Sequence, residues 1–119
     1  MRSLVDGTPV VFNYWYATCP PCREEMPALG MLASEFTGRV TFVGINPQDD
    51  AATARSVAAE RGTAYRQLLD STQRSVDALG LTGFPTTVVV RADGSIAQSI
   101  RRAVSAEELR SILDAELAA

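Results

Sequence analysis

Two cysteines stand three residues apart in the stretch "YATCPPCREEMP", residues 16 to 27, and they are the only thiols of the chain. Thiols at this spacing can form a structural staple, supply half of a metal site, or make a redox centre that alternates between a disulfide and a dithiol. The two prolines between them stiffen the connection. A pattern typical of a helix follows directly, so the pair is predicted to lie at the start of a helix.

The staple and the metal site explain the pair less well than redox chemistry does. A disulfide between Cys19 and Cys22 closes almost no loop, so it removes little entropy from the unfolded chain. A structural zinc site takes four ligands, whereas the sequence has no histidine and no second C-x-x-C pair. A metal would need ligands from another chain, so we expect no metal and no cofactor. The residues favour a redox centre.

The start of a helix suits such chemistry, because its first N–H groups have no partner within the helix and its dipole stabilises negative charge. Cys19 is predicted at or just before this start, exposed, with its thiol pKa lowered. Cys22 comes one turn later on the same face and should be sheltered. Pro20 and Pro21 fit the first turn, where a missing N–H costs nothing.

The elements that must position this pair follow from the hydrophobic pattern, which alternates between strand and helix periods. Strands are predicted at Val10–Tyr16 and Arg39–Ile45, with a hairpin from Thr86 to Ile100 that turns at Asp93-Gly94. Helices are predicted at Pro20–Phe36, at Asp50–Arg61, shortly before Gly80, and after Ser105, the last one burying Leu109, Ile112, Leu113 and Leu117. This order predicts one α/β domain over residues 1–119, with a central mixed sheet of about four strands and helices on both faces.

Composition limits the partners. With 119 residues, 46% hydrophobic and 21% charged, the chain can bury a core without help from a disulfide. Its net charge of −3, with both signs interspersed, offers no basic surface for nucleic acid. No apolar run approaches the roughly 20 residues that cross a bilayer, and "MRSLVDGTP" lacks the apolar region of a signal peptide. We expect no nucleic-acid partner and no membrane segment in this chain.

The stretches "VVFNYWYATCPPCREEMPAL" and "GFPTTVVV" resemble the thioredoxin superfamily. Within it they resemble the TlpA/ResA-like branch of thiol-disulfide oxidoreductases, which includes the CcmG/DsbE-type reductases of cytochrome c maturation. The resemblance covers nearly the whole chain. Trp15 stands four residues before Cys19, as in the family. Pro27 matches the proline that kinks the family's active-site helix, and Pro85 matches its cis-proline opposite the disulfide.

The resemblance implies a thioredoxin fold and thiol-disulfide exchange with protein substrates. It implies that Cys19 attacks a substrate disulfide, that Cys22 resolves the mixed disulfide, and that the backbone beside Pro85 helps to hold the substrate's extended chain. The candidate substrate-binding residues are Trp15, Thr18, Pro20, Pro21, Phe84, Pro85 and Thr86. For Trp15 the alternative is packing in the core.

The chain departs from the family at several positions. Thr18 stands where the family usually has a second tryptophan, and Asn13 stands where ordinary thioredoxins carry a buried aspartate. The TlpA/ResA-like branch has an acidic residue after its second strand. Asp49 in "INPQDD" matches it and is the third candidate catalytic residue, with capping of the next helix as its alternative role. The family usually begins earlier, so we expect an N-terminal part of its domain to be clipped here.

The sequence predicts a thiol-disulfide oxidoreductase that reduces protein disulfides, in cytochrome c maturation or in the thiol homeostasis of the cell envelope. An upstream reductant or oxidant would be its second partner. One alternative is an oxidant or isomerase, because C-x-x-C potentials range from about −270 to −120 mV. Another is a non-catalytic module that binds a partner around CPPC and Pro85, and a third is a peroxidase. Resemblance alone implies an extracytoplasmic setting, and we expect a monomer.

Overall fold

The computed structural model describes residues 7–119 and confirms the predicted α/β class. Its strands are β1 (Val10–Tyr14), β2 (Thr41–Asn46), β3 (Arg66–Leu69), β4 (Thr86–Val90) and β5 (Ile96–Ile100). Its helices are α2 (Pro20–Glu35), α3 (Ala51–Glu60), α4 (Arg74–Leu79) and α5 (Ala106–Ala118). The predictions about the N-terminal start fall on residues 1–6, which lie outside the described residues.

A mixed sheet with the strand order β3-β2-β1-β4-β5 forms the centre of the molecule. β1 pairs in parallel with β2 and antiparallel with β4. All five β1 residues are buried, which explains why the strand is a nearly continuous apolar run in the sequence. The middle of the sheet therefore leads straight into the loop that carries the cysteines.

The hydrophobic pattern predicts no strand at Arg66–Leu69, yet this segment forms β3 and pairs in parallel with β2. β3 is a short edge strand, and all four of its residues keep some exposure to solvent. Edge strands are commonly short and polar, so they lack the apolar run that marks a central strand. The fold class stands, with five strands where about four are predicted.

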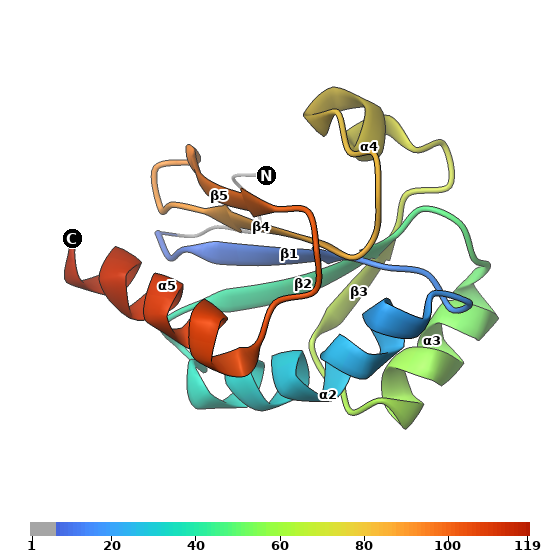
Figure 1. Cartoon of the computed structure of the whole chain (residues 1–119), viewed down its shortest axis with the longest axis horizontal. Helices are drawn as coiled ribbons and strands as arrows, with labels where there is room; N and C mark the ends of the chain where they lie inside the picture. Colours follow the sequence, from blue (N-terminus) through green and yellow to red (C-terminus); the bar gives the residue numbers. More distant parts are fainter. Residues whose placement is uncertain (1–6) are drawn as a thin grey trace.

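Helices cover both faces of the sheet, as predicted (Figure 1). α2, α3 and α5 lie on one face, and the short α4 lies on the other. The apolar core under α2 and α5 includes Leu29, Leu32, Leu109 and Leu113. Leu117, predicted on the same buried stripe, is 36% exposed. That prediction is wrong because the last turn of α5 extends beyond the layer that would cover it.

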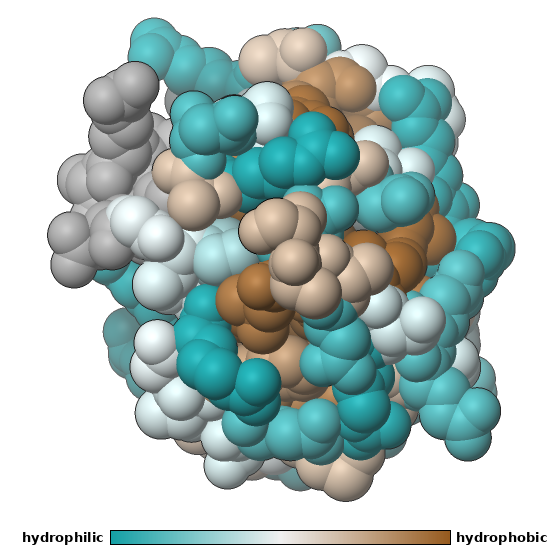
Figure 2. Space-filling view, turned by 90° about the vertical axis from the view of Figure 1, so that its left-hand side faces the viewer, coloured by the Kyte–Doolittle hydropathy of each residue, from teal (hydrophilic) through white to brown (hydrophobic). Residues whose placement is uncertain are grey.

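The end of the molecule away from the cysteine loop, where the C-terminal part of α5 lies, has a mixed surface (Figure 2). Apolar areas appear there in separate places among polar ones. The large hydrophobic side chains exposed in the described part of the chain are Met31, Leu69, Ile96 and Leu117. None of the helices within residues 7–119 combines the length and apolar character that a bilayer crossing requires.

Close packing between α2 and the turn after α3 holds the helix that carries the cysteines. A Cβ built on Gly30 would overlap the carbonyl oxygen of Gly62. The Gly62 turn is held to the end of α3, because the N–H of Gly62 donates to the Ala59 carbonyl at 3.3 Å and the N–H of Thr63 donates to the Ala58 carbonyl at 3.0 Å. Gly30 is thus the residue that lets the two backbones meet.

We predict that Gly30→Ala destabilises the protein by about 1 to 3 kcal/mol, the usual cost of overpacking a well-packed site. Urea unfolding of the oxidised protein measures this difference. Gly83→Ala is the matched control, because a Cβ there meets no atom within 4 Å and Gly83 has no positive φ. Equal loss of stability in the two variants would contradict the packing argument.

Candidate active site

The structure confirms a disulfide between Cys19 and Cys22 at the start of α2. Their Cα atoms lie 5.3 Å apart. Cys19 is the N-cap residue, with extended backbone angles, and its carbonyl accepts the first helical hydrogen bond from the Arg23 N–H at 3.1 Å. The sequence places the pair correctly because prolines at the first two helical positions favour a helix start there.

The same two prolines limit how well the helix can stabilise a thiolate. A side chain at the N-cap accepts from the N–H of the second or third helical residue. Pro21 is the second and has no N–H, so Cys22, the third, is the one residue of this kind with an N–H to offer the Cys19 sulfur, and in the disulfide form the two make no cap hydrogen bond. This helix start is therefore a weaker anion site than one without prolines.

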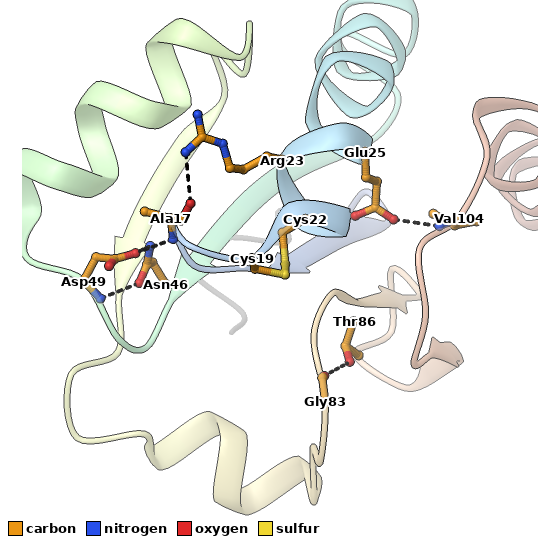
Figure 3. Close-up of a disulfide and its surroundings, with 10 residues drawn as sticks. All are labelled: Ala17, Cys19, Cys22, Arg23, Glu25, Asn46, Asp49, Gly83, Thr86 and Val104. Carbon is orange, nitrogen blue, oxygen red and sulfur yellow. Dashed lines mark hydrogen bonds between the residues drawn. A yellow bond between two sulfur atoms is a disulfide. The ribbon is translucent and has the colours of Figure 1, made fainter.

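The turn before β4 lies beside the disulfide. The Phe84–Pro85 peptide bond is cis, which confirms the prediction from the resemblance. Thr86 Oγ1 donates to the carbonyl of Gly83 at 2.8 Å and fixes this turn. In Figure 3 the sulfur atoms point toward the side on which Gly83 and Thr86 lie. An extended chain bound along this turn would meet the sulfur atoms.

Aromatic side chains cover the disulfide more fully than predicted. Tyr16 from the β1–α2 loop and Phe84 from the cis-proline turn form an edge-to-face pair with ring centroids 5.5 Å apart, and both pack against the cluster that contains the cysteines. Cys22 is fully buried, as predicted, but Cys19 is only 3% exposed. The prediction of an exposed Cys19 is therefore wrong for the disulfide form, because the two rings bridge the loops on either side of it.

The predicted substrate-binding residues differ in their access to solvent. Thr18, Pro20 and Pro21 are exposed on the rim, Phe84 is half-buried, and Pro85 and Thr86 are buried. Thr18 and Pro20 also line a hollow of about 430 Å³ together with Ala17, Arg23, Glu24 and Arg61. Trp15 is fully buried, and its Nε1 donates to Gln67 Oε1 at 3.0 Å. Its position favours the packing alternative over contact with a substrate.

Asp49 holds the loop in front of Cys19. Its Oδ2 accepts from the Ala17 N–H at 2.6 Å and from Asn46 Nδ2 at 2.8 Å. The alternative role predicted for Asp49, capping the next helix, belongs instead to Asp50, whose side chain accepts from the Thr53 N–H at 2.7 Å. Sequence alone could not separate two adjacent aspartates, since either could precede the helix.

Glu25 is a functional candidate that the sequence analysis missed. It lies one turn after Cys22 (Figure 3), and it is only 6% exposed. Its Oε2 accepts from the Val104 N–H at 2.7 Å, whereas Oε1 has no hydrogen-bond partner among residues 7–119. Burial raises the pKa of Glu25 to about 7, against the lowering effect of the Val104 hydrogen bond.

A carboxyl group with this pKa can both hold and release a proton near neutral pH. When ionised, it also opposes formation of a second negative charge on the neighbouring Cys22 sulfur. One signal in the sequence could have revealed Glu25, because it is three residues after Cys22 and four before Leu29, on the inward face of the predicted helix. Within the described part of the chain, no three potential metal ligands cluster.

Comparison with known proteins places the chain among redox proteins of this architecture. The family model described as Redoxin matches residues 2–117. A thiol-disulfide oxidoreductase ResA of Halalkalibacterium halodurans is 28% identical over 99 residues, covering 82% of this chain and 56% of that protein. The thiol:disulfide interchange protein DsbE of Escherichia coli K12 is 34% identical over 94 residues, covering 78% and 49%.

Among solved structures, a secreted disulfide oxidoreductase of Mycobacterium tuberculosis, homologous to Escherichia coli DsbE, is similar with a TM-score of 0.83 and 28% identity. The match covers 92% of this chain and 82% of that one. These findings confirm the predicted thioredoxin fold and the resemblance to ResA and DsbE. The chain spans about half the length of these two curated relatives.

We predict that Glu25 makes the oxidised protein less stable as the pH rises. Its pKa is 4.5 in the unfolded reference and about 7 in the folded protein, so the folded form binds the proton more tightly. The resulting stabilisation is complete below about pH 4.5 and is lost as the pH rises through about 7. This loss amounts to about 3 kcal/mol, and denaturant unfolding at a series of pH values measures it.

The matched variants separate this buried carboxyl from an ordinary one. Glu25→Gln should remove the loss of stability between these pH values, because a glutamine does not titrate. Glu24→Gln, at the exposed neighbouring position, should keep it. If the wild-type protein and Glu25→Gln show the same dependence on pH, the assignment of Glu25 as the titrating group is wrong.

Proposed function

Since the chain belongs to the Redoxin family, we propose that it is a thiol-disulfide oxidoreductase of the ResA/DsbE type that reduces disulfides in proteins. The observation that carries this proposal is the Cys19–Cys22 disulfide at the start of α2, beside the cis-proline turn. A non-catalytic binding module would need the exposed rim but not the disulfide. A buried carboxyl group next to Cys22 supports exchange chemistry further.

In the first step, the Cys19 thiolate attacks one sulfur of a substrate disulfide. A bond forms between Cys19 and that sulfur, the substrate disulfide breaks, and the second substrate sulfur leaves as a thiolate that takes up a proton. The Cys22 N–H at the helix start stabilises the attacking thiolate. Opening of the Tyr16–Phe84 pair would admit the substrate to the Cys19 sulfur, which those rings flank.

In the second step, Cys22 must lose its proton before it can attack Cys19. The Glu25 carboxylate, one turn away, accepts this proton, because its pKa of about 7 allows it to be ionised at neutral pH. The Cys22 thiolate then attacks the Cys19 sulfur, the mixed disulfide breaks, and the second substrate sulfur leaves as a thiolate that takes up a proton. Two electrons and two protons have passed to the substrate, and a dithiol partner upstream restores the reduced enzyme.

The remaining candidate residues would position the substrate and the loop. We propose that the backbone of Phe84, Pro85 and Thr86 holds the substrate's chain, while the exposed rim residues contact its flanks. Asp49 fixes the Ala17 N–H, so its proposed contribution is the conformation of the loop before Cys19. Asp49 is a candidate catalytic residue in the sequence, but this proposal assigns the transfer of the Cys22 proton to Glu25, since Glu25 lies on the same helix as Cys22.

Two features favour the reducing direction. A strong oxidant of this class is strong because its reduced form is stabilised. Here Pro21 removes one backbone donor to the Cys19 thiolate, and the Glu25 carboxylate opposes a thiolate on Cys22. Both effects withhold stabilisation from the reduced state and so lower the potential. An oxidant or isomerase remains the alternative.

We further propose an extracytoplasmic setting, supported by similarity to a secreted disulfide oxidoreductase. Proteins whose disulfides need reduction in the cell envelope, including apocytochrome c, would be the substrates. An upstream dithiol protein would be the electron donor, and the protein would act as a monomer.

We predict a reduction potential between about −270 and −200 mV, measured by equilibration in glutathione or dithiothreitol redox buffers. Pro21→Ala should lower the Cys19 thiol pKa and shift the potential upward by up to about 30 mV, because it restores a donor at the second helical position. Pro20→Ala is the control, since the N–H of the first helical residue does not reach the N-cap side chain. A wild-type potential near −120 mV would instead identify an oxidant.

We also predict that the two cysteines have separate roles in exchange. A Cys22→Ser variant should accumulate mixed disulfides with a disulfide-containing peptide, because no resolving thiol remains. A Cys19→Ser variant should not, since Cys22 is fully buried. Non-reducing gel electrophoresis and mass spectrometry show which adducts form. Adducts on Cys22 alone would reverse the assigned roles, and none in either variant would favour the non-catalytic module.

A further inference from the structure

A group of polar side chains is buried between α2 and the sheet. Asn13 on β1 and Thr87 on β4 are register partners, so they lie side by side on one face of the sheet. Val11 and Val89, two residues along each strand, pack against the leucines of α2, so this is the face that α2 covers. Both polar residues are no more than 1% exposed.

Tyr65 reaches this group from the segment before β3. Its ring packs against Phe42 on β2, with the ring centroids 5.8 Å apart. Its hydroxyl oxygen accepts a hydrogen bond from Asn13 Nδ2 at 3.3 Å. Asn13 therefore fixes the position of the Tyr65 hydroxyl, while the hydroxyl hydrogen of Tyr65 remains available to another acceptor.

Glu25 is buried on α2, one turn before Leu29. Leu29 packs with Val11 and Val89, and α2 runs back along β1 (Figure 1), so Glu25 lies over the next pair along these strands, Asn13 and Thr87. Burial raises the pKa of Tyr65, the hydrogen bond from Asn13 opposes this, and the negative charge of Glu25 raises it further. A charge affects a hydroxyl group in this way only within electrostatic reach. The Tyr65 hydroxyl and the Glu25 carboxyl are therefore within electrostatic reach of each other, although their sequence positions are 40 residues apart.

The hydrogen-bonding needs of this group are not met by the contacts within it. Asn13 Oδ1, Thr87 Oγ1 and Glu25 Oε1 are all buried, and none has a hydrogen-bond partner in the described residues. Buried polar atoms without partners are rare in proteins, and internal water commonly supplies the missing contacts. A carboxylate accepts hydrogen bonds about twice as strong as a neutral acceptor does. It is therefore the favoured target of the free Tyr65 hydrogen.

We propose that Tyr65, held by Asn13, directs its hydroxyl hydrogen at Glu25 Oε1 through one internal water and acts as a positioning residue for the carboxyl group behind Cys22. Thr87, beside Asn13, supplies a further hydroxyl to the same water. The importance of the interaction between Tyr65 and Glu25 for thiol-disulfide exchange rests on the proposed function, in which Glu25 takes the proton of Cys22. The interaction itself does not depend on turnover.

The groups that face Glu25 are few. Cys22 shares its helix, Tyr65 approaches from the side of β3, and the segment after β5 contributes the Val104 N–H. β1 and β4 present the neutral Asn13 and Thr87. In the disulfide form Cys22 does not titrate, so Tyr65 is the titratable side chain that this arrangement leaves next to Glu25. The oxidised protein is therefore the form in which to test the proposal.

The test is to titrate Glu25 in the oxidised wild-type protein and in the oxidised Tyr65→Phe variant. The carbon-13 NMR signal of the Glu25 carboxyl reports the midpoint. Glu25→Gln identifies its signal. A hydrogen bond from Tyr65 favours the ionised carboxylate, so its removal should move the Glu25 midpoint upward by about 0.5 to 1 pH unit. Tyr14→Phe is the matched control, because it removes a buried hydroxyl on the opposite face of the sheet and should leave the midpoint unchanged.

An unchanged or lowered midpoint in Tyr65→Phe overturns the proposal. It would indicate that Tyr65 donates to Asn13 instead. If Tyr65→Phe does not fold, incorporation of 3-fluorotyrosine keeps Tyr65 in place. The fluorine-19 signal of Tyr65, assigned by elimination with Tyr14→Phe and Tyr16→Phe, should titrate with the Glu25 midpoint and lose that step in Glu25→Gln. A signal without this step also overturns the proposal.

These readouts are independent of the proposed function. A wild-type protein that fails to exchange thiols, but whose Glu25 midpoint rises in Tyr65→Phe, would refute the oxidoreductase proposal and support this one. If the wild-type protein exchanges thiols, but the Glu25 midpoint is the same in the wild type and in Tyr65→Phe, the oxidoreductase proposal is supported and the proposal about Tyr65 is refuted.

Discussion

The peptide group of Ala17 is held on both sides, and the reactive end of the molecule depends on this contact. Asp49 accepts its N–H at 2.6 Å, and Arg23 donates to its carbonyl at 3.2 Å. Asp49 follows β2 and Arg23 lies on α2, so the contact joins the central sheet to the first turn of the helix. Because Ala17 is two residues before Cys19, the backbone conformation that makes Cys19 the N-cap is fixed by side chains from two other parts of the fold, one of them 32 residues away.

Two acidic side chains near the disulfide serve different purposes because their surroundings differ. Asp49 engages N–H donors and shapes a loop. Glu25 is buried and has a single backbone donor, and its burial raises its pKa to about 7. Asn13 occupies the strand position where the resemblance places a buried aspartate in ordinary thioredoxins. In this chain the buried acid comes from the helix instead, one turn from the thiol that must lose a proton.

Sequence predicted the features that depend on neighbouring residues. The cysteine spacing, the prolines of the first turn and the apolar runs of β1 and β4 are local, and the resemblance supplied the cis bond before Pro85. The sequence could not predict contacts between segments that are far apart along the chain. The burial of Glu25 depends on Val104, 79 residues away, and the Tyr65 contact with Asn13 spans 52 residues. The stretch "REEM" after Cys22 looks like an exposed, charged turn of helix in the sequence. That Glu25 is buried becomes evident only when the segment around Val104 is seen to pack over it.

The hydrogen bond between Glu25 and Val104 ties the redox centre to the last fifth of the chain. Val104 lies between β5 and α5, and its neighbours Leu109 and Leu113 belong to the core under α2. A chain truncated after β5 would leave this face of α2 open to water and the carboxyl group hydrated. Transfer of the C-P-P-C sequence alone to another protein would consequently not transfer its redox properties. Grafted into another helix without the C-terminal segment, it would carry the sulfurs but not the electrostatics that govern them.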